Sequence, residues 1–377
     1  MRRIHIGIIV AILCIVTGGT TLCVARWNVW FVTPEPPAYT GDTIPCYFNT
    51  FGREHVPGFV QHQGIWQDTI DESHLRFIVF GDVHNQVDSA QWETVGARHG
   101  QIDFYAQCGD FMERSQFYYS QLLSHSLQNS PFANLPLIAC IGNHEYIKGI
   151  IKHPTPLWLE LFPCPANGPK RFLGTTYYVD FEYARYIVID TNPLLRLSDY
   201  TILNTWLHKV ISEAQERYTI VMMHHPVYSC SMGRSNVGIS CFLKHTLAKA
   251  DLVVSGHDHN YARRLPFVGI SSARKFYLHK LHADMTRVGS GFQHYLLVDI
   301  TADTLHMRTY EMNEGFLYDE IKLIHHADSL RIEDLGVNRN EYIDIPNKYK
   351  ERNGYKVKKF NKRREERLAM KTPCSQE

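Results

Sequence analysis

Residues 76–84 read RFIVFGDVH, an apolar run that ends at Asp82 and His84. A short apolar run of this kind is typical of a strand buried on both faces. Aspartate and histidine, which follow it at once, are residue types that bind metal ions. In open α/β sheets, functional groups gather in the loops just beyond the carboxyl ends of the strands. The stretch therefore predicts an α/β core with a ligand-bearing loop at the end of one of its strands.

Four further segments contain the same metal-binding residue types. They are Cys108-Gly109-Asp110, Gly142-Asn143-His144-Glu145, His224-His225-Pro226 and Gly256-His257-Asp258-His259. Any one of them alone is typical of a turn with a surface histidine or of a structural corner. Because all five occur in one chain, most of them directly after an apolar run, together they indicate a metal site. Glycine precedes the ligand type in four of the five, and glycine permits tight turns and close approach to an ion.

The apolar runs also predict the order of the elements. From Arg76 onward, short strand candidates alternate with longer helix-like stretches, and a strand-rich end follows. The candidates are residues 77–80, 137–141, 186–189, 220–223, 252–254, 295–300 and 305–310. We therefore expect a signal peptide or N-terminal membrane anchor over residues 1–25, a lead-in segment over 26–73, a catalytic domain over 74–326 and a basic tail over 327–377.

The ligand types select a class of metal site. Carboxylate, imidazole and amide oxygen without thiolate suit Fe, Mn or Zn in a hydrolytic site rather than a structural zinc. The five segments supply enough ligands for two ions. One carboxylate must then lie between ions about 3.5 to 4 Å apart, a spacing that stabilises both the attacking and the leaving oxygen. A hydroxide bridging the ions would be the nucleophile.

The order GDVH, GDF, GNHE, HHP and GHDH over roughly residues 75–325 resembles the calcineurin-like metallophosphoesterase superfamily. Residues 256–266, GHDHNYARRLP, are similar to the purple acid phosphatase branch. The resemblance implies an α/β fold of the α+β-like kind, a four-layer sandwich of two mixed β-sheets flanked by helices. It also implies a metal-dependent phosphatase or phosphodiesterase that hydrolyses a phosphate monoester or diester.

Carried over position by position, the resemblance implies a role for each site residue. One metal is bound by Asp82, His84 and His259, the other by Asn143, His224 and His257, and Asp110 bridges them. His144 is the expected acid, which protonates the leaving oxygen or stabilises the phosphoryl charge, and Glu145 orients it. His225 and Asp258 are expected behind the ligands, with an exposed loop position as the alternative for Asp258.

One position departs from the purple branch. That branch has a tyrosine ligand three residues after the bridging aspartate, where this chain has Glu113. We therefore do not expect the purple chromophore, and the ferric identity of one metal does not follow. Glu113 is expected as a solvated residue at a helix start, with a ligand role as the alternative. Residues 26–73 are also too short for the N-terminal β-sandwich domain of the plant enzymes.

The first residues predict export. Arg2 and Arg3 precede an apolar run over residues 4–16, and small residues follow it. Either the segment is cleaved after Ala25, or residues 4–24 remain as a membrane anchor; a buried N-terminal helix is the plainer alternative. The protein is then secreted, periplasmic or membrane-anchored. Export would permit disulfides, and Cys230 with Cys241 could close a short loop.

Composition and charge give limited information about binding partners. The chain has 377 residues, 44% hydrophobic and 20% charged, as in an ordinary globular protein, and its net charge of +1 indicates no partner class. Residues 348–371 carry a charge of +8, which suits binding of anionic lipid or nucleic acid, with a solvated end as the alternative. We expect a phosphate-ester substrate and no nucleic-acid partner, and the sequence does not indicate the oligomeric state. The alternatives are a nuclease or cyclic-nucleotide phosphodiesterase, and a non-catalytic protein that binds lipid or nucleic acid.

Overall fold

The protein is described by a computed structural model. It describes residues 8–16, 19–27 and 73–336, apart from 134, 148–152, 156–157, 159–160, 163, 195, 215–217, 232–233, 278–284 and 327–328. The chain divides into two compact units, residues 1–43 and 44–377. Nearly all of the predicted lead-in segment and of the predicted basic tail lies outside the described residues.

The first large sheet has seven strands in the order β14-β12-β13-β11-β10-β9-β8. Its centre is parallel, because β9, β10, β11 and β13 pair in the same direction. Antiparallel strands complete both edges, so the sheet is mixed. The strands are β8 Tyr177–Asp180, β9 Ala184–Ile189, β10 Tyr218–Met223, β11 Leu252–Ser255, β12 Tyr261–Arg264, β13 Phe267–Gly269 and β14 Arg287–Gly289.

The second large sheet also has seven strands, in the order β18-β17-β16-β15-β3-β4-β5. The first three in sequence run parallel, and the last four form an antiparallel meander that joins them through the β15–β3 pair. The strands are β3 Leu75–Phe80, β4 Phe104–Gln107, β5 Leu137–Ala139, β15 His294–Ile300, β16 Thr304–Glu311, β17 Leu317–His326 and β18 Ser329–Asp334. Two short strands, β6 Tyr146–Ile147 and β7 His153–Pro154, pair separately.

A hydrophobic core fills the space between the two sheets. Along β9, Tyr186 and Val188 belong to this core, whereas Ile187 and Ile189 belong to a second cluster on the other face of the same sheet. The strand is thus buried on both faces, which is why it appears in the sequence as a continuous apolar run rather than an alternating one. β10 and β11 divide their residues between the two clusters in the same way.

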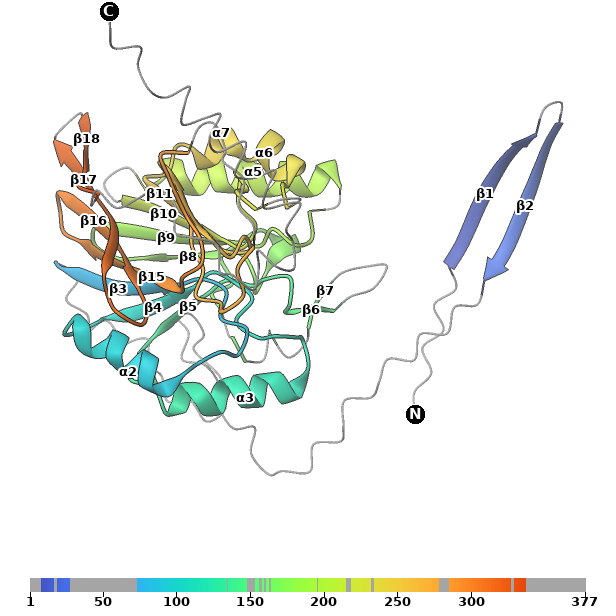
Figure 1. Ribbon diagram of the computed structural model, residues 1–377. Coiled ribbons are helices and arrows are strands. Elements are labelled where there is room, and N and C mark those ends of the chain that lie inside the picture. Colours follow the sequence, from blue (N-terminus) through green and yellow to red (C-terminus); the bar gives the residue numbers. More distant parts are fainter. Residues whose placement is uncertain are drawn as a thin grey trace, which may run out of the picture. The chain divides into compact units, whose positions relative to one another are not determined.

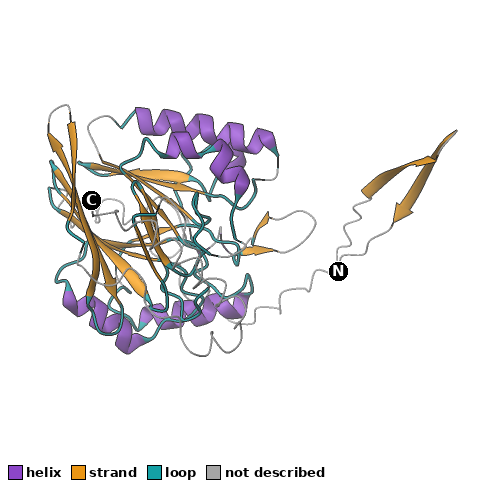
Figure 2. Ribbon diagram, turned by 45° about the horizontal axis from the view of Figure 1, so that its top comes forward, coloured by secondary structure: helices purple, strands orange, loops and turns teal. Residues whose placement is uncertain are grey.

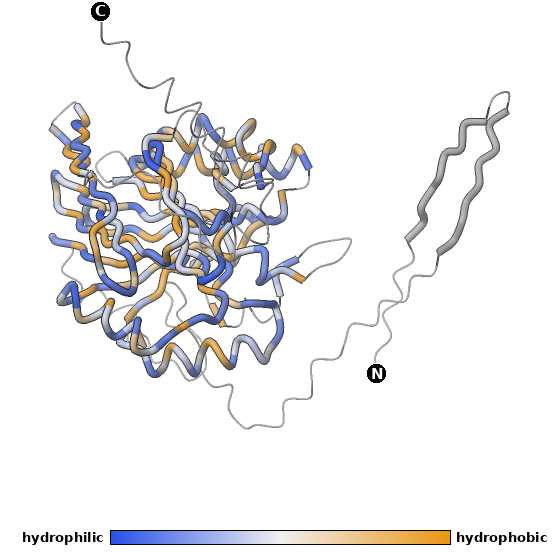
Figure 3. The backbone as a smooth tube through the Cα atoms, in the orientation of Figure 1, coloured by the Kyte–Doolittle hydropathy of each residue, from blue (hydrophilic) through white to orange (hydrophobic). Residues whose placement is uncertain are grey.

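Helices form the two outer layers, with strands between them (Figures 1 and 2). Hydrophobic and hydrophilic residues alternate along these helices (Figure 3), which is typical of helices that pack one face on a sheet. On one side, Trp92 stacks on Phe80 with ring centroids 4.3 Å apart. The helices are α2 Ser89–Arg98 and α3 Phe117–Gln128 on the β3–β5 side, α5 Leu197–Ser212, α6 Val237–Phe242 and α7 Lys244–Leu247 on the other, and the short 3-10 turn η1 Lys170–Phe172.

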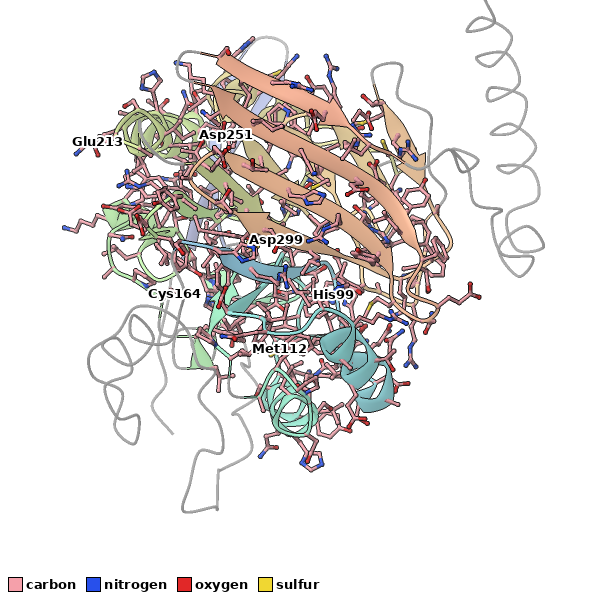
Figure 4. The ribbon with its side chains drawn as sticks, turned by 90° about the vertical axis from the view of Figure 1, so that its left-hand side faces the viewer. His99, Met112, Cys164, Glu213, Asp251 and Asp299 are labelled. Atoms are coloured by element: carbon pink, nitrogen blue, oxygen red, sulfur yellow. The ribbon has the colours of Figure 1, made fainter. Side chains whose placement is uncertain are left out.

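The meander β15–β18 has an outer face that no described helix covers, and Asp299 lies on that face (Figure 4). Along β16, outward residues are partly exposed and inward residues are buried in strict alternation. A strand with one solvent-exposed face alternates apolar and polar residues in its sequence. The meander therefore differs from the central strands of the first sheet, which are buried on both faces.

The N-terminal unit contains two described strands, β1 Ile8–Val16 and β2 Gly19–Trp27, which pair antiparallel. Within the described part of the chain, no helix has the length and apolar character needed to cross a membrane. The role of residues 1–25 as a signal peptide or anchor stays a prediction.

The predicted fold class is confirmed, since two mixed sheets pack between helices. Every predicted strand is present, although β5 ends at Ala139 instead of residue 141. The second sheet continues past residue 326, the expected end of the domain, because β18 pairs with β17. Strand β18 also supplies Asp334, whose carboxylate lies 2.9 Å from the Arg263 guanidinium. The sequence does not predict strand β18, because this strand is mostly exposed and lacks an apolar run.

Candidate metal centre

Five loops bring the predicted ligands together at one end of the two sheets. Three of the loops follow the parallel strands of the second sheet, and two follow the parallel centre of the first. Parallel strands present their carboxyl ends at a common edge, which is where such loops meet. The loops carry Asp82 and His84 after β3, Asp110 after β4, Asn143 after β5, His224 after β10, and His257 and His259 after β11.

The first group of ligand atoms comes from Asp82, His84 and His259, all of which are buried. His259 Nε2 lies 3.4 Å from Asp82 Oδ1 and 3.2 Å from His84 Nε2. The other ring nitrogen of His259, Nδ1, donates to the carbonyl of Lys275 at 2.6 Å. That bond leaves Nε2 of His259 free to face the group, as expected for a metal-binding imidazole.

The second group comes from Asn143, His224 and His257. His224 Nε2 lies 3.2 Å from Asn143 Oδ1 and 3.2 Å from His257 Nδ1. His224 Nδ1 donates to the carbonyl of Cys108 at 2.9 Å, so this ring is also held with Nε2 toward the group. An amide oxygen and two imidazole nitrogens thus approach one another, in the combination that the resemblance implies for the second metal.

Asp110 lies between the two groups. Its Oδ2 is 3.2 Å from His224 Nε2 and 3.9 Å from His84 Nε2. Its Oδ1 accepts the backbone N–H of His144 at 2.8 Å, which fixes the carboxylate in this orientation. One carboxylate is therefore within reach of both groups, at the position expected for a bridging ligand.

The glycines beside the ligands allow these loops to pack closely. A Cβ atom on Gly142 would lie 2.1 Å from the backbone nitrogen of Asp110, and one on Gly256 would lie 2.7 Å from Asp82 Oδ2. Gly109 has a φ of +86°, which side chains rarely adopt. These glycines thus allow one ligand loop to approach another closely.

Four of the predicted ligands have left-handed backbone conformations. The φ angles are 51° at His84, 54° at Asp110, 69° at His257 and 51° at His259. A residue other than glycine held at positive φ costs on the order of 1 kcal/mol or more, and such residues gather at functional sites. The loops therefore place these side chains at the expense of backbone stability.

The donors fit a metal ion. Asp82 Oδ1 is a buried carboxylate oxygen without a hydrogen-bond donor among the described residues, and His84 Nδ1 is likewise unsatisfied. An oxygen left in this state is costly unless a ligand completes it. Burial raises the pKa of the nearby Cys108 thiol well above its usual range, and Cys108 is in none of the ligand groups found among the described residues. Oxygen and imidazole donors without thiolate suit Fe, Mn or Zn.

Asp110 and His224 shift each other's pKa in opposite directions. Burial alone would raise the pKa of Asp110, but the imidazoles of His224, His144 and His84 outweigh it and hold the pKa well below its usual range. Burial likewise lowers the pKa of His224, and Asp110 outweighs it and raises the pKa to about 9. The bare side chains thus form a carboxylate–imidazolium pair, and metal binding would displace the imidazolium proton.

His144 lies at the opening of the centre, with 28% of its side chain exposed. Its Nδ1 hydrogen-bonds to the backbone carbonyl of Glu113, and its Nε2 lies 3.9 Å from Asp110 Oδ2. A ring whose Nδ1–H is donated to a carbonyl presents Nε2 to the site. His144 is therefore placed to exchange a proton or a hydrogen bond with a group bound beside Asp110.

The expected role of Glu145 needs correction, because its carboxylate does not orient the His144 ring. It accepts backbone N–H groups from Asp110 at 3.0 Å, Met112 at 2.8 Å and Gly142 at 2.8 Å. Burial, with the charge of Asp110, raises its pKa to about 8. Glu145 thus joins the loops after β4 and β5, and the carbonyl of Glu113 orients His144.

His225 and Asp258 lie behind the ligands. Thr191 Oγ1 is 2.9 Å from His225 Nδ1, and the His225 ring packs on the His257 ring with centroids 4.4 Å apart. Asp258 is buried, so the exposed alternative for it is wrong. Its carboxylate accepts the backbone N–H groups of Cys230 at 2.7 Å and Ser231 at 3.1 Å, which fastens the loop after β10 to the loop after β11.

Glu113, at the position of the tyrosine ligand in the purple branch, lies beside the first group. Its Oε2 is 3.5 Å from His84 Nδ1, and 41% of its side chain is exposed. It is thus partly solvated, as expected, and also near enough to pair with the outer nitrogen of a ligand histidine. Cys230 and Cys241 do not form the suggested disulfide with each other.

Three residues near the centre have no counterpart in the sequence prediction. Thr191 contacts His225, while Arg234 lies 2.9 Å from His257 Nδ1 and Tyr277 packs on His259 with ring centroids 4.6 Å apart. Thr191 lies two residues after the apolar run of β9, which is the signal that could have revealed it. Arg234 and Tyr277 lie in loops far from any strand end and carry no such signal.

Comparisons with known proteins support the family. Residues 75–261 match the family model of the calcineurin-like phosphoesterases. Purple acid phosphatase PPD1 from yellow lupin (Lupinus luteus) is a solved structure with a TM-score of 0.52 and 16% identity, covering 66% of this chain and 53% of its own. This chain thus spans about half the length of the lupin protein, and at that identity the likeness shows the fold.

Two other solved structures are similar at lower scores. GAP50, the anchor in the inner membrane complex of Plasmodium, has a TM-score of 0.46 and 14% identity, covering 73% of this chain and 98% of its own. PhoD has a TM-score of 0.49 and 11% identity, covering 79% of this chain and 78% of its own. No match was found among curated protein sequences. Residues 75–261 are therefore a calcineurin-like phosphoesterase domain.

Proposed function

We propose that the protein is a dinuclear metal-dependent phosphoesterase that hydrolyses a phosphate monoester or diester. The observation that carries the proposal is the position of Asp110, whose carboxylate lies between two groups of oxygen and imidazole donors. A single structural ion would need only one such group. Two groups with a shared carboxylate are the arrangement that a two-metal hydrolytic site requires.

The chain would hold the ions with the seven side chains that the loops bring together. Asp82, His84 and His259 would bind one ion, and Asn143, His224 and His257 the other. Asp110 would contact both. Bound ions supply Lewis-acid polarisation of the phosphoryl group and make water acidic enough to attack at ordinary pH.

His144 would then act on the leaving group. Its Nδ1 is fixed by the carbonyl of Glu113, so its Nε2 can donate a proton to the leaving oxygen or a hydrogen bond to a phosphoryl oxygen. The partial exposure of the His144 side chain leaves room for substrate on that side. Glu145 would keep Asp110 and Gly142 in place through its hydrogen bonds to their backbone nitrogens.

The branch within the superfamily is a finer proposal. Because Glu113 stands where the purple enzymes have a tyrosine, we propose that the metal-loaded protein has no tyrosinate charge-transfer band. The visible spectrum of protein loaded with iron tests this. A strong purple colour would show that another tyrosine takes the ligand position.

An activity screen tests the function. Full-length protein loaded with Mn, Fe or Zn should hydrolyse a mono-aryl or a bis-aryl phosphate, and Asp110→Asn should remove this activity. Asp303→Asn is a matched control, because Asp303 is an exposed aspartate in the turn after β15. Activity on the bis-aryl phosphate alone would favour the nuclease or cyclic-nucleotide alternative. No hydrolysis of either ester by metal-loaded wild type would contradict the proposal.

A further inference from the structure

Arg234 occupies an unusual position at the metal centre. Its Nη2 lies 2.9 Å from Nδ1 of His257, one of the proposed ligands, and donates to it. The loop that carries Arg234 is fixed by Asp258, which accepts the backbone N–H groups of Cys230 and Ser231. The guanidinium is therefore held over the second ligand group by the fold and does not reach it from a distant surface.

The positive charge of Arg234 lacks a close anion. Only 24% of its side chain is exposed, and the nearest carboxylate oxygen, Oδ1 of Asp258, is 3.9 Å from Nε. Nε itself is buried without a hydrogen-bond partner among the described residues. The Asp258 oxygens already accept other hydrogen bonds, including the hydroxyl of Ser229 at 3.1 Å. A partly buried guanidinium in this state is costly unless something else supplies an anion.

Two arginines that are more deeply buried show how carboxylates compensate the charge of a guanidinium. Arg185 binds both oxygens of Asp180, at 2.6 and 2.7 Å. Arg263 binds Asp319 at 2.5 and 3.1 Å and Asp334 at 2.9 Å. Both lie away from the proposed ligands and are satisfied within the chain. Arg234 differs because its strongest described partner is an imidazole nitrogen and not a carboxylate.

That imidazole nitrogen has one lone pair. His257 Nδ1 can accept from Arg234 or bind an ion, but it cannot do both. When Nδ1 serves as a ligand, Arg234 loses this acceptor and its need for an anion increases. The Arg234 guanidinium carbon lies 4.4 Å from the centre of the Tyr277 ring. This cation–π contact can hold the guanidinium beside the metal centre when the hydrogen bond to His257 is lost.

From this arrangement we propose that Arg234 binds the phosphoryl group of the substrate. The proposal rests on the proposed phosphoesterase function and adds a residue that recognises the substrate. A guanidinium forms two parallel hydrogen bonds with phosphate oxygens, and phosphate supplies the missing negative charge. Tyr277 is then a positioning residue, which acts by holding Arg234 and not by touching the substrate.

Binding of inorganic phosphate to metal-loaded, full-length protein tests the proposal. Calorimetry should show that Arg234→Met weakens phosphate binding on the order of 10- to 100-fold, as expected for loss of a charge-assisted hydrogen bond. Arg234→Lys should keep part of the affinity, since it retains the charge but not the planar fork. Metal content should equal that of the wild type in both variants.

Lys275→Met is the matched control. Lys275 is exposed, and its Nζ lies 5.1 Å from the Tyr277 ring, so the change removes a positive charge near the same ring. The substitution alters only the side chain and retains the backbone carbonyl that accepts from His259. We expect its phosphate affinity to stay within about threefold of the wild type, because solvent screens exposed charges. An equal loss in both variants would mean that net charge alone attracts phosphate and would overturn the assignment.

Two further outcomes would overturn the inference. If Arg234→Met binds phosphate as tightly as the wild type while the wild type hydrolyses esters, Arg234 does not hold the phosphoryl group and the proposed function stands. If Arg234→Met binds more metal than the wild type even with metal in excess, the guanidinium keeps an ion off His257 and does not serve to bind the phosphoryl group. A wild type that neither binds metal nor hydrolyses esters would instead contradict the proposed function, and this inference with it.

Discussion

Asp319 and Asp110 are two buried carboxylates with opposite surroundings. Asp319 accepts hydrogen bonds from Tyr261 at 2.6 Å and Arg263 at 2.5 Å, and Arg287 lies 3.2 Å away. Asp110 has imidazoles instead, with His224 at 3.2 Å and other histidines at 3.9 Å. Arginines stay charged at any ordinary pH, whereas imidazoles can be neutral and bind metal. The charge of Asp319 is thus compensated by arginines at any ordinary pH, whereas the imidazoles around Asp110 can become neutral and bind a metal ion with it.

The backbone shows the same contrast. Asp319 lies within β17, beside a register shift in the β16–β17 pair, and its φ is not positive, whereas Asp110 has a φ of 54° in the loop after β4. A strained residue persists where the surrounding structure holds it for a purpose. We infer that Asp319 serves stability and Asp110 serves function. Substitutions at the two positions should therefore change different properties.

The largest effect is expected at Asp110. Asp110→Asn should lower phosphoesterase turnover on the order of 10³-fold, because it removes the charge that both ions would share. Urea unfolding of the metal-free protein should change little in comparison. Turnover and unfolding are measured on one preparation, with Asp303→Asn as the control. A variant that unfolds readily but keeps its turnover would reverse the assignment.

Asp319 should show the opposite pattern. Asp319→Asn should lower the free energy of unfolding by about 3 to 5 kcal/mol, because Arg263 and Arg287 would lose the charge of the buried carboxylate that both contact. Turnover per folded molecule should stay near the wild type, since the described side-chain partners of Asp319 lie in β12 and β14 and not in the ligand loops. Urea titration followed by activity of the folded fraction measures both. A loss of turnover without loss of stability would place Asp319 in the functional group.

His144 separates chemistry from metal binding. His144→Ala should reduce turnover on the order of 10²-fold, because a positioned acid contributes that much, while metal content stays near that of the wild type. Elemental analysis beside a kinetic assay measures both quantities. If metal content falls together with turnover, His144 is a ligand and not the acid.

The smallest effect concerns pH and His99. Burial, with the charges of Arg308, Arg98 and Arg76, lowers the pKa of His99 to about 4. A histidine whose folded pKa is depressed stabilises the protein above its unfolded pKa, and that stability is lost as pH falls from about 6.5 toward 4. His99→Gln should therefore reduce the acid-dependent loss of unfolding free energy by about 1 kcal/mol.

The measurement for His99 is urea unfolding at pH 7 and pH 4.5. His125→Gln is the control, since His125 is exposed on α3. The Tyr295 hydroxyl donates to His99 Nε2 at 2.6 Å, and glutamine can keep an acceptor there. The same pH dependence in wild type and His99→Gln would show that this histidine does not carry the effect.

Much of the site was predictable because strand ends leave a local signal. Asp82, His224 and His257 all lie within two residues of a buried strand, so an apolar run marks their place in the sequence. The topology of parallel strands then brings those ends together. The grouping of His259 with Asp82, and of His257 with His224, followed from the resemblance, and the distances agree with it.

The rest depends on contacts between distant segments, which no local pattern records. Glu145 looked like a partner for His144, its neighbour in sequence, but its carboxylate binds the backbone of Asp110 and Gly142. Asp258 looked equally suited to solvent, yet it fastens the loop that carries Arg234. Strand β18 was missed because an edge strand buries little and lacks an apolar run.

The number of ions bound per chain tests the central claim most directly. Protein loaded with Mn, Fe or Zn, freed of excess metal and analysed by element should hold two ions per chain, and Asp110→Asn should hold fewer. Fewer than one ion per wild-type chain, with every metal offered, would contradict the two-ion centre that Asp110 is proposed to bridge.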